Sequence, residues 1–93
     1  MQKISTEKIE SALEDLPGWH YHEDRIERNF EFADFSEAFA FLSRVALLSE
    51  KLNHHPNWSG VYNEVALALT THDAGGVTER DLKFAREVDK MLG

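Results

Sequence analysis

The chain contains no cysteine and no long apolar run. Without a thiol there is no disulfide framework, no thiolate nucleophile and no thiolate metal site, so packing alone must hold the fold. No stretch approaches the ~20 consecutive apolar residues of a membrane-spanning helix. The segment from Met1 to Ser5 also lacks the apolar core of a signal peptide. We therefore expect a cytoplasmic protein that has no membrane partner.

Basic residues are also scarce. The chain carries 10 Lys and Arg residues against 17 Asp and Glu residues, a formal net charge of -7. A protein that binds the phosphate backbone needs a clustered basic face, so we expect no direct contact with nucleic acid. The 93 residues are 42% hydrophobic and 29% charged, a composition typical of globular domains. This length and composition predict one domain that covers residues 1–93.

Apolar periodicity and capping signals predict three helices and four strands. Ser5 is expected to cap the first helix and Pro17-Gly18 to end it, whereas Thr78 caps the last helix with Asp81 at N3. The other elements are strands at 19–22 and 25–32, a helix at 36–52, and strands at 57–62 and 65–70. The last helix is expected to bury Leu82, Ala85, Val88 and Leu92. This order, α-β-β-α-β-β-α, predicts an α+β fold in which three helices pack on one face of a single antiparallel four-stranded sheet.

The helix predicted at 36–52, with Ser36 as its N-cap, has more apolar surface than one contact with a sheet requires. One apolar stripe consists of Phe35, Phe39, Leu42 and Ala46, and the other of Ala38, Phe41, Val45, Leu48 and Leu52. Either the helix is sunk deep in the core, or one stripe is a subunit interface. Because 93 residues leave little chain to cover a second side, we expect a homotetramer (a dimer of dimers), or at least a dimer, formed through this helix.

His54 and His55 stand side by side between the long helix and the third strand. Pro56 bars further helix and favours extended backbone for His55, so both rings are held at a junction between elements. An imidazole titrates near ~6.5, so either ring can give or take a proton near neutral pH. The segment is therefore a candidate for acid/base chemistry. The alternative is a polar linker with two solvated histidines.

Two further ionisable residues are expected to converge with this pair at one end of the sheet: His72 follows the fourth strand, and Asp81 opens the last helix. Three histidines and an aspartate suit zinc or ferrous iron. However, neighbouring histidines in extended backbone point to opposite sides, whereas ligands normally sit at i, i+2 on a strand or i, i+4 on a helix. A serine nucleophile is also disfavoured, because there is no Gly-x-Ser-x-Gly elbow. We therefore favour general acid/base chemistry without a metal.

The same residues carry a resemblance to a known family. The matching positions are Glu50, His54-His55-Pro56, Trp58, Tyr62, His72 after the pair Thr70-Thr71, and Asp81. In this pattern the chain resembles the pterin-4a-carbinolamine dehydratases, also known as dimerisation cofactors of a homeodomain transcription factor. The resemblance extends from Gly18-Trp19 through the Phe-rich segment 39–46 to Glu79-Arg80-Asp81.

The resemblance implies a dehydratase that removes water from 4a-hydroxytetrahydropterin, the 4a-carbinolamine, and gives quinonoid dihydropterin. Such an enzyme recycles the tetrahydropterin cofactor of aromatic amino acid hydroxylases and needs no metal or organic cofactor. The family's four-stranded sheet with three helices, and its tetramer through the long helix, agree with the predictions above. The alternative is a non-enzymatic adaptor, a transcriptional coactivator that binds a homeodomain-type partner through its oligomerisation helix. That role would extend the expected location to the nucleus.

Position by position, the resemblance also implies roles for single residues. His54 and His72 match the family's acid/base histidines, and His55 matches a third active-site histidine that helps to hold the pterin. Substrate contacts are implied for His54, His55, Pro56, Thr71, His72, Asp73 and Ala74. Supporting positions around the pocket are Trp19, Glu50 and Asp81. Ala74 stands where mammalian members carry a cysteine, which puts any partner contact through that thiol in doubt here.

Two of these positions have alternative roles. Asp81 is expected to orient His72 and favour its protonated form, as an opposite charge nearby does; alternatively, it only caps the last helix. Trp19 is expected to border the pocket of the flat pterin ring, with core packing as the alternative. For Trp58 we expect core packing.

Overall fold

Three helices and four strands occur in a computed structural model that describes residues 2–93. Met1, the first residue of the predicted domain, lies outside the described residues. The elements are α1 (Thr6–Leu13), β1 (His20–His22), β2 (Arg25–Glu31), α2 (Phe35–Leu52), β3 (Asn57–Val61), β4 (Glu64–Leu69), the short 3-10 helix η1 (His72–Ala74) and α3 (Glu79–Leu92). The predicted α+β class and the order of its helices and strands are confirmed.

The four strands form one antiparallel sheet in the order β1-β2-β4-β3, so β3 is an edge strand. Glu23 and Asp24 connect β1 to β2, both at positive φ (47° and 65°), as a two-residue hairpin turn with matching twist requires. The second hairpin turn was expected at Asn63-Glu64 but lies at Tyr62-Asn63, and Glu64 already pairs with Val61. Tyr62 takes up the positive φ of this turn (50°).

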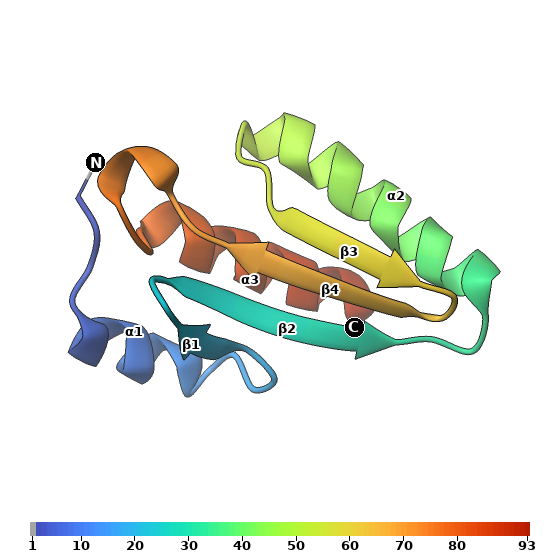
Figure 1. Cartoon of the computed structure of the whole chain (residues 1–93), viewed down its shortest axis with the longest axis horizontal. Helices are drawn as coiled ribbons and strands as arrows, with labels where there is room; N and C mark the ends of the chain where they lie inside the picture. Colours follow the sequence, from blue (N-terminus) through green and yellow to red (C-terminus); the bar gives the residue numbers. More distant parts are fainter. Residues whose placement is uncertain (1) are drawn as a thin grey trace.

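The helices cover one face of the sheet and leave the other open (Figure 1). The covered face carries the alternate strand residues Ile26, Phe30, Val65, Leu67 and Leu69, all buried. From α3, the predicted residues Leu82, Ala85 and Val88 are buried. Phe84 is fully buried as well, whereas the prediction for Leu92 was wrong, because that side chain near the end of the chain is 42% exposed. No helix within residues 2–93 combines the length and apolarity needed to span a bilayer.

The long helix α2 begins one residue earlier than predicted. Asp34, not Ser36, is its N-cap, and the Asp34 carboxylate accepts a hydrogen bond from the Glu37 backbone N–H (2.9 Å). The earlier cap draws Phe35 into the first turn of the helix. A carboxylate at this end also meets the positive pole of the helix dipole, which explains why it displaces serine.

The two apolar stripes of α2 differ in exposure. Of one stripe, Ala38, Phe41, Val45 and Leu48 are buried against the sheet. Of the other stripe, Phe35 and Phe39 are each 57% exposed. The helix is therefore not sunk in the core of this chain, and the second stripe forms an apolar surface.

The first helix starts as predicted, because the Ser5 side chain accepts a hydrogen bond from the Lys8 N–H. It ends at Leu13, before the predicted stop at Pro17-Gly18. The residue before a proline avoids helical backbone, so the chain leaves the helix through turns instead. Leu16 is nevertheless buried, and it packs in the core together with Ile9.

Candidate functional site

His54 is held at the point where α2 ends. Asn53 closes the helix in the left-handed conformation (φ 51°), and the His54 N–H donates to the Ser49 carbonyl oxygen (3.1 Å). This bond is typical of helix ends that close through a left-handed residue. The backbone therefore turns His54 inward, and its side chain is buried with only 9% of the residue exposed.

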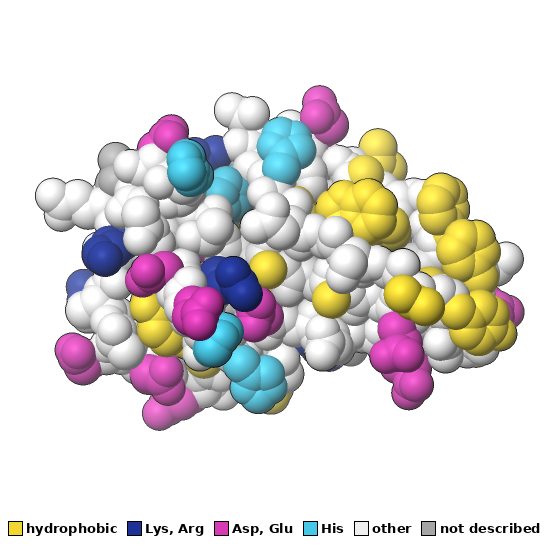
Figure 2. Space-filling model, in the orientation of Figure 1, with side chains coloured by type: hydrophobic (Ala, Val, Ile, Leu, Met, Phe, Trp, Pro, Cys, Tyr) yellow, Lys and Arg dark blue, Asp and Glu magenta, His cyan; other side chains and the backbone are white. Residues whose placement is uncertain are grey.

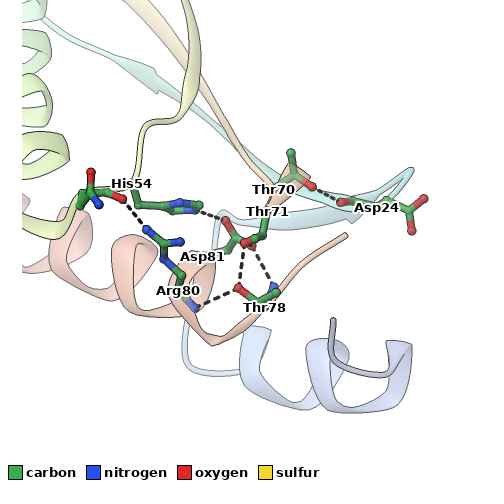
Figure 3. Close-up of polar contacts among 8 residues, drawn as sticks. Asp24, His54, Thr70, Thr71, Thr78, Arg80 and Asp81 are labelled. Carbon is green, nitrogen blue, oxygen red and sulfur yellow. Dashed lines mark hydrogen bonds and ion pairs between the residues drawn. The ribbon is translucent and has the colours of Figure 1, made fainter. Parts of the chain in front are cut away.

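The buried ring of His54 contacts Asp81, which lies in the first turn of α3 (Figure 3). His54 Nε2 and Asp81 Oδ1 are 2.5 Å apart, and Asp81 is fully buried. Because an ionised carboxylate can only accept hydrogen bonds, Nε2 carries the hydrogen. The expectation that Asp81 orients His72 was wrong. The carboxylate reaches the histidine that follows α2, across 27 positions in the sequence.

The other oxygen of Asp81 has two donors of its own. Oδ2 accepts hydrogen bonds from the Thr71 hydroxyl and from the Thr78 backbone N–H, each at 2.9 Å. The second bond is half of the predicted capping box between Thr78 and Asp81. Asp81 therefore does more than cap α3, since one oxygen caps the helix and the other contacts His54 instead of the expected His72.

The second ring nitrogen of His54 is available to a ligand. Nδ1 makes no hydrogen bond within residues 2–93. Among the same residues no buried side-chain nitrogen or oxygen lacks a hydrogen-bond partner, so Nδ1 must reach the molecular surface. The ring itself is held by Phe84, whose centroid lies 6.3 Å away in an edge-on arrangement. His54 therefore presents one nitrogen to the interior and one to the outside.

His72 lies near this site but does not join the hydrogen-bond network. It opens η1 directly after Thr71, and both His72 and Asp73 are exposed. Gly75 ends this turn at φ 75°, where a left-handed residue is needed. Figure 2 shows histidine side chains near the loop after β4 and the α2–β3 connection of Figure 1, and a separate group lower in the same view. Of the residues expected to converge, the structure brings His54 and Asp81 into contact and leaves the His72 ring exposed.

His55 and Pro56 continue from His54 toward β3. The His55 ring is exposed, and its Nε2 lies 3.5 Å from Glu50 Oε1, itself exposed on the last turns of α2. An exposed pair at this distance contributes little to stability. Pro56 is half-buried, beside α2. The structure therefore leaves His55 and Glu50 free to contact a ligand.

The two tryptophans lie opposite to expectation. Trp58, expected in the core, is 60% exposed because it lies on the edge strand β3. Trp19 is buried in the core, and its indole N–H donates to Asp89 (2.9 Å). Asp89, which lies farther along α3 than Asp81, also forms an ion pair with Arg28 (2.8 Å). The expectation that Trp19 borders the pocket therefore gives way to its alternative, core packing.

One open hollow of the molecule does not contain the histidine pair. It measures about 460 Å³ and lies over the open face of the sheet, where Ala66, Ala68 and Ser59 form a floor of small side chains. Asn57, three positions after His54 in the chain, is among the residues that line it. Within residues 2–93 no group of three or more His, Cys, Asp or Glu side chains is arranged to hold a metal ion.

Sequence reasoning missed the polar residues behind the histidine. Thr71 was expected only as a substrate contact and Thr78 only as a cap, yet their hydroxyl oxygens are 2.8 Å apart beside Asp81. Arg80 also donates to the carbonyl oxygen of Asn53 and ties the start of α3 to the end of α2. The Thr-x-x-Asp capping pattern indicated where the Asp81 carboxylate lies, but no pattern in the sequence indicated its second partner.

Comparison with known proteins identifies the family. Residues 2–91 match the family model described as pterin 4 alpha carbinolamine dehydratase. A protein of Synechococcus sp. (strain WH7803), named "Putative pterin-4-alpha-carbinolamine dehydratase", is 52% identical over 82 residues, which are 88% of either chain. A protein of Burkholderia orbicola (strain MC0-3) with the same name is 48% identical over 91 residues, covering 96% of this chain and 89% of that one.

Two solved structures share the fold. The crystal structure of a transcriptional coactivator/pterin dehydratase from Brucella melitensis superposes with a TM-score of 0.95 at 41% identity, covering 99% of this chain and 100% of that one. A pterin dehydratase-like protein described as a RuBisCO assembly factor in the alpha-carboxysome has a TM-score of 0.67 at 26% identity, covering 81% and 87%. The match over residues 2–91, the relatives near 50% identity and the shared fold establish that the chain belongs to the pterin-4a-carbinolamine dehydratase family.

Proposed function

We propose that the chain, as a single domain of residues 1–93, is a dehydratase of 4a-hydroxytetrahydropterin. The product is quinonoid dihydropterin, so the enzyme would recycle the tetrahydropterin cofactor of aromatic amino acid hydroxylases. One observation carries this proposal beyond family membership. His54 is a buried imidazole with Nε2 on a carboxylate and Nδ1 at the surface, which is the arrangement that a proton-transferring histidine needs.

The reaction consists of two proton transfers around one bond cleavage. An acid donates a proton to the 4a-hydroxyl oxygen, the C4a–O bond breaks with its electron pair going to oxygen, and water leaves. A base removes a proton from a ring N–H, and that electron pair forms the new C=N double bond at C4a. One proton is consumed and one is released, so the ring loses one water molecule. Two groups that titrate near neutrality serve both steps.

In this proposal His54 and His72 perform the two transfers, one as acid and one as base, and His55 helps to hold the pterin. His54 faces the substrate from the end of α2, whereas His72 approaches from η1, so the two act from different segments of the chain. Pro56 and the loop of Thr71, Asp73 and Ala74 provide substrate contacts. Glu50, within 3.5 Å of His55, supports that ring.

Turnover of chemically generated 4a-hydroxytetrahydropterin tests this function directly. We expect the loss of the 4a-hydroxy species to accelerate in proportion to protein concentration. We also expect kcat to be unchanged after exhaustive dialysis against a chelator, with elemental analysis to verify removal, because histidines rather than a Lewis acid move the protons. Activity that disappears on chelation and returns with zinc or iron contradicts the metal-free mechanism, and no turnover at all contradicts the enzyme.

We further propose that the chain assembles as a homotetramer, or at least a dimer, through α2. The proposal is supported by an exposed apolar surface of Phe35 and Phe39 on α2 and Trp58, Val61 and Tyr62 on and after β3, which Figure 2 shows as clustered hydrophobic side chains. Isolated small domains rarely leave so many large apolar side chains together in water.

Light scattering at micromolar concentration tests the assembly. We expect the mass of a tetramer or dimer, and a smaller species for Phe39→Asp, because a carboxylate placed in the apolar surface must be desolvated on association. Leu92→Asp is the matched control, since Leu92 is also exposed but lies near the end of α3. A monomeric wild type, or equal masses for both variants, contradicts an α2 interface.

The second candidate function is that of an adaptor. The Brucella melitensis neighbour is described as a transcriptional coactivator/pterin dehydratase, and the exposed apolar surface of α2 offers a place for a homeodomain-type partner. An adaptor without enzymatic activity would bind such a partner and fail the turnover assay. A protein that does both would pass each test.

A further inference from the structure

The buried hydroxyl of Thr71 lies behind the His54–Asp81 pair, and the proposed reaction gives this hydroxyl no part in the proton transfers so far. Thr71 lies two residues after the end of β4, and hydrogen bonds hold its backbone in place. Its N–H donates to the Gly76 carbonyl oxygen (2.9 Å), and its carbonyl oxygen accepts from the Ala74 N–H (3.0 Å). The side chain is thus held inward at 7% exposure, with its Oγ1 2.9 Å from Asp81 Oδ2.

The proton directions in this network are determined. A hydroxyl has one hydrogen to donate. Asp81 Oδ2 can only accept, so the Thr71 hydroxyl donates to it. In the 2.8 Å contact between the two threonines Thr71 must then be the acceptor and Thr78 the donor. The Thr78 oxygen in turn accepts from the Arg80 backbone N–H (3.2 Å). The chain of hydrogen bonds therefore runs from the α3 backbone through two hydroxyls to one carboxylate.

This network fixes the orientation of the Asp81 carboxylate and leaves Oδ1 to contact His54. Oδ2 is occupied by the Thr71 hydroxyl and the Thr78 N–H, so the carboxylate plane is fixed and Oδ1 points at His54 Nε2. The hydrogen bond on one nitrogen of an imidazole decides which nitrogen carries the proton. A fixed Oδ1 therefore selects the form of neutral His54 with its hydrogen on Nε2 and a free lone pair on Nδ1.

We propose that Thr71 is a positioning residue for His54: its hydroxyl locks Asp81, which holds His54 in the Nε2–H tautomer, so that Nδ1 is the atom that exchanges the proton with substrate. The inference rests on the proposed function only in its last clause. The tautomer is a property of the free protein, so its measurement remains valid if the pterin is not the substrate.

Nitrogen-15 NMR of histidine-labelled protein tests the first part without substrate. For neutral wild-type His54 we expect a protonated Nε2 and an unprotonated Nδ1, assigned by comparison with His54→Gln. Thr71→Val keeps the shape but removes the hydroxyl, so the carboxylate is free to turn Oδ1 away from His54 Nε2, and we expect a shift toward a mixture of the two tautomers. Thr71→Ser restores the hydroxyl and should restore the wild-type spectrum. Thr70→Val is the matched control, because the Thr70 hydroxyl donates to the Asp24 carbonyl oxygen and does not touch Asp81.

Turnover of the 4a-hydroxypterin tests the second part. We expect kcat to fall about tenfold in Thr71→Val, the scale of one hydrogen bond to a charged group, and to return in Thr71→Ser. If Thr71→Val does not fold, Thr71→Ala is compared with Thr71→Ser in both measurements. A wild-type His54 protonated on Nδ1 overturns the proposal. The wild-type tautomer of His54 in Thr71→Val, or in Thr71→Ala, also overturns the proposal. If the nitrogen-15 spectra are as expected but the wild type shows no turnover, the proposed function is refuted, whereas the positioning of His54 by Thr71 and Asp81 is supported.

Discussion

His54→Ala and His72→Ala should each lose about 10²-fold or more in kcat, the usual scale of removing a general acid or base. Each reaction cycle needs one proton donated and one removed, and a single remaining histidine cannot easily do both. The two variants should differ in stability. His72 is exposed, so its loss should change the free energy of unfolding by less than about 0.5 kcal/mol. Removing His54 leaves the buried Asp81 oxygen without its donor, at a cost of about 1–3 kcal/mol.

Circular dichroism and thermal unfolding establish that both variants remain folded, and stopped-flow turnover measures the loss. His22→Ala is the matched control: that ring is exposed on β1, with its Nε2 3.5 Å from the neighbouring Glu23 Oε1. We expect it to be as active and as stable as the wild type. A folded double variant of His54 and His72 with wild-type turnover would exclude both residues from the chemistry.

Asp81→Asn should lower kcat by about 10²-fold or more while the protein stays folded. Two donors face the Oδ2 position, so the amide oxygen of the asparagine must take that place and its NH₂ group must face His54. An NH₂ group can only donate, so Nε2 becomes an acceptor and the hydrogen of neutral His54 moves to Nδ1. The nitrogen facing the substrate then carries the wrong protonation state. The same change beside the histidine of serine proteases costs about 10⁴-fold in kcat through the wrong tautomer.

The stability of Asp81→Asn should fall by only about 1 kcal/mol, because the cap hydrogen bond survives and only the charge at the helix start is lost. Asp89→Asn provides the control on the same helix. Asp89 accepts hydrogen bonds from Trp19 and Arg28 away from the histidines, so its substitution should affect stability but leave kcat unchanged. Wild-type kcat in a folded Asp81→Asn protein would assign the aspartate to the helix cap alone.

Local signals in the sequence were sufficient for most of the fold. Alternation located the strands, and capping residues located the helix starts to within one or two positions, because those signals act between residues three or four apart. Errors arose where two local signals competed. Asp34 and Ser36 are both good caps, and the carboxylate took the helix start. Core packing was expected for Trp58, but a strand at the edge of a sheet has a neighbouring strand on one side only, and Trp58 is exposed.

For α2 the sequence predicted two apolar stripes but did not indicate which of them packs against the sheet. Helical period places Phe39 and Val45 on different sides of the same helix, and both sides are apolar. Contact with β4 buries the stripe of Val45 and leaves that of Phe39 exposed. The choice depends on how the helix sits on a sheet whose strands come from distant parts of the chain, which no local pattern encodes.

The sequence by itself determined the order of the elements and the capping box that places Asp81 at the start of α3. Only the tertiary structure decided which histidine this carboxylate serves. A carboxylate has two oxygens, and the cap uses only one of them. The other oxygen, Oδ1, contacts His54 for two reasons. The left-handed residue Asn53 turns His54 inward, and the Thr71 hydroxyl fixes the carboxylate plane. These contacts join three segments that are distant in the sequence, and only packing brings them within hydrogen-bond distance.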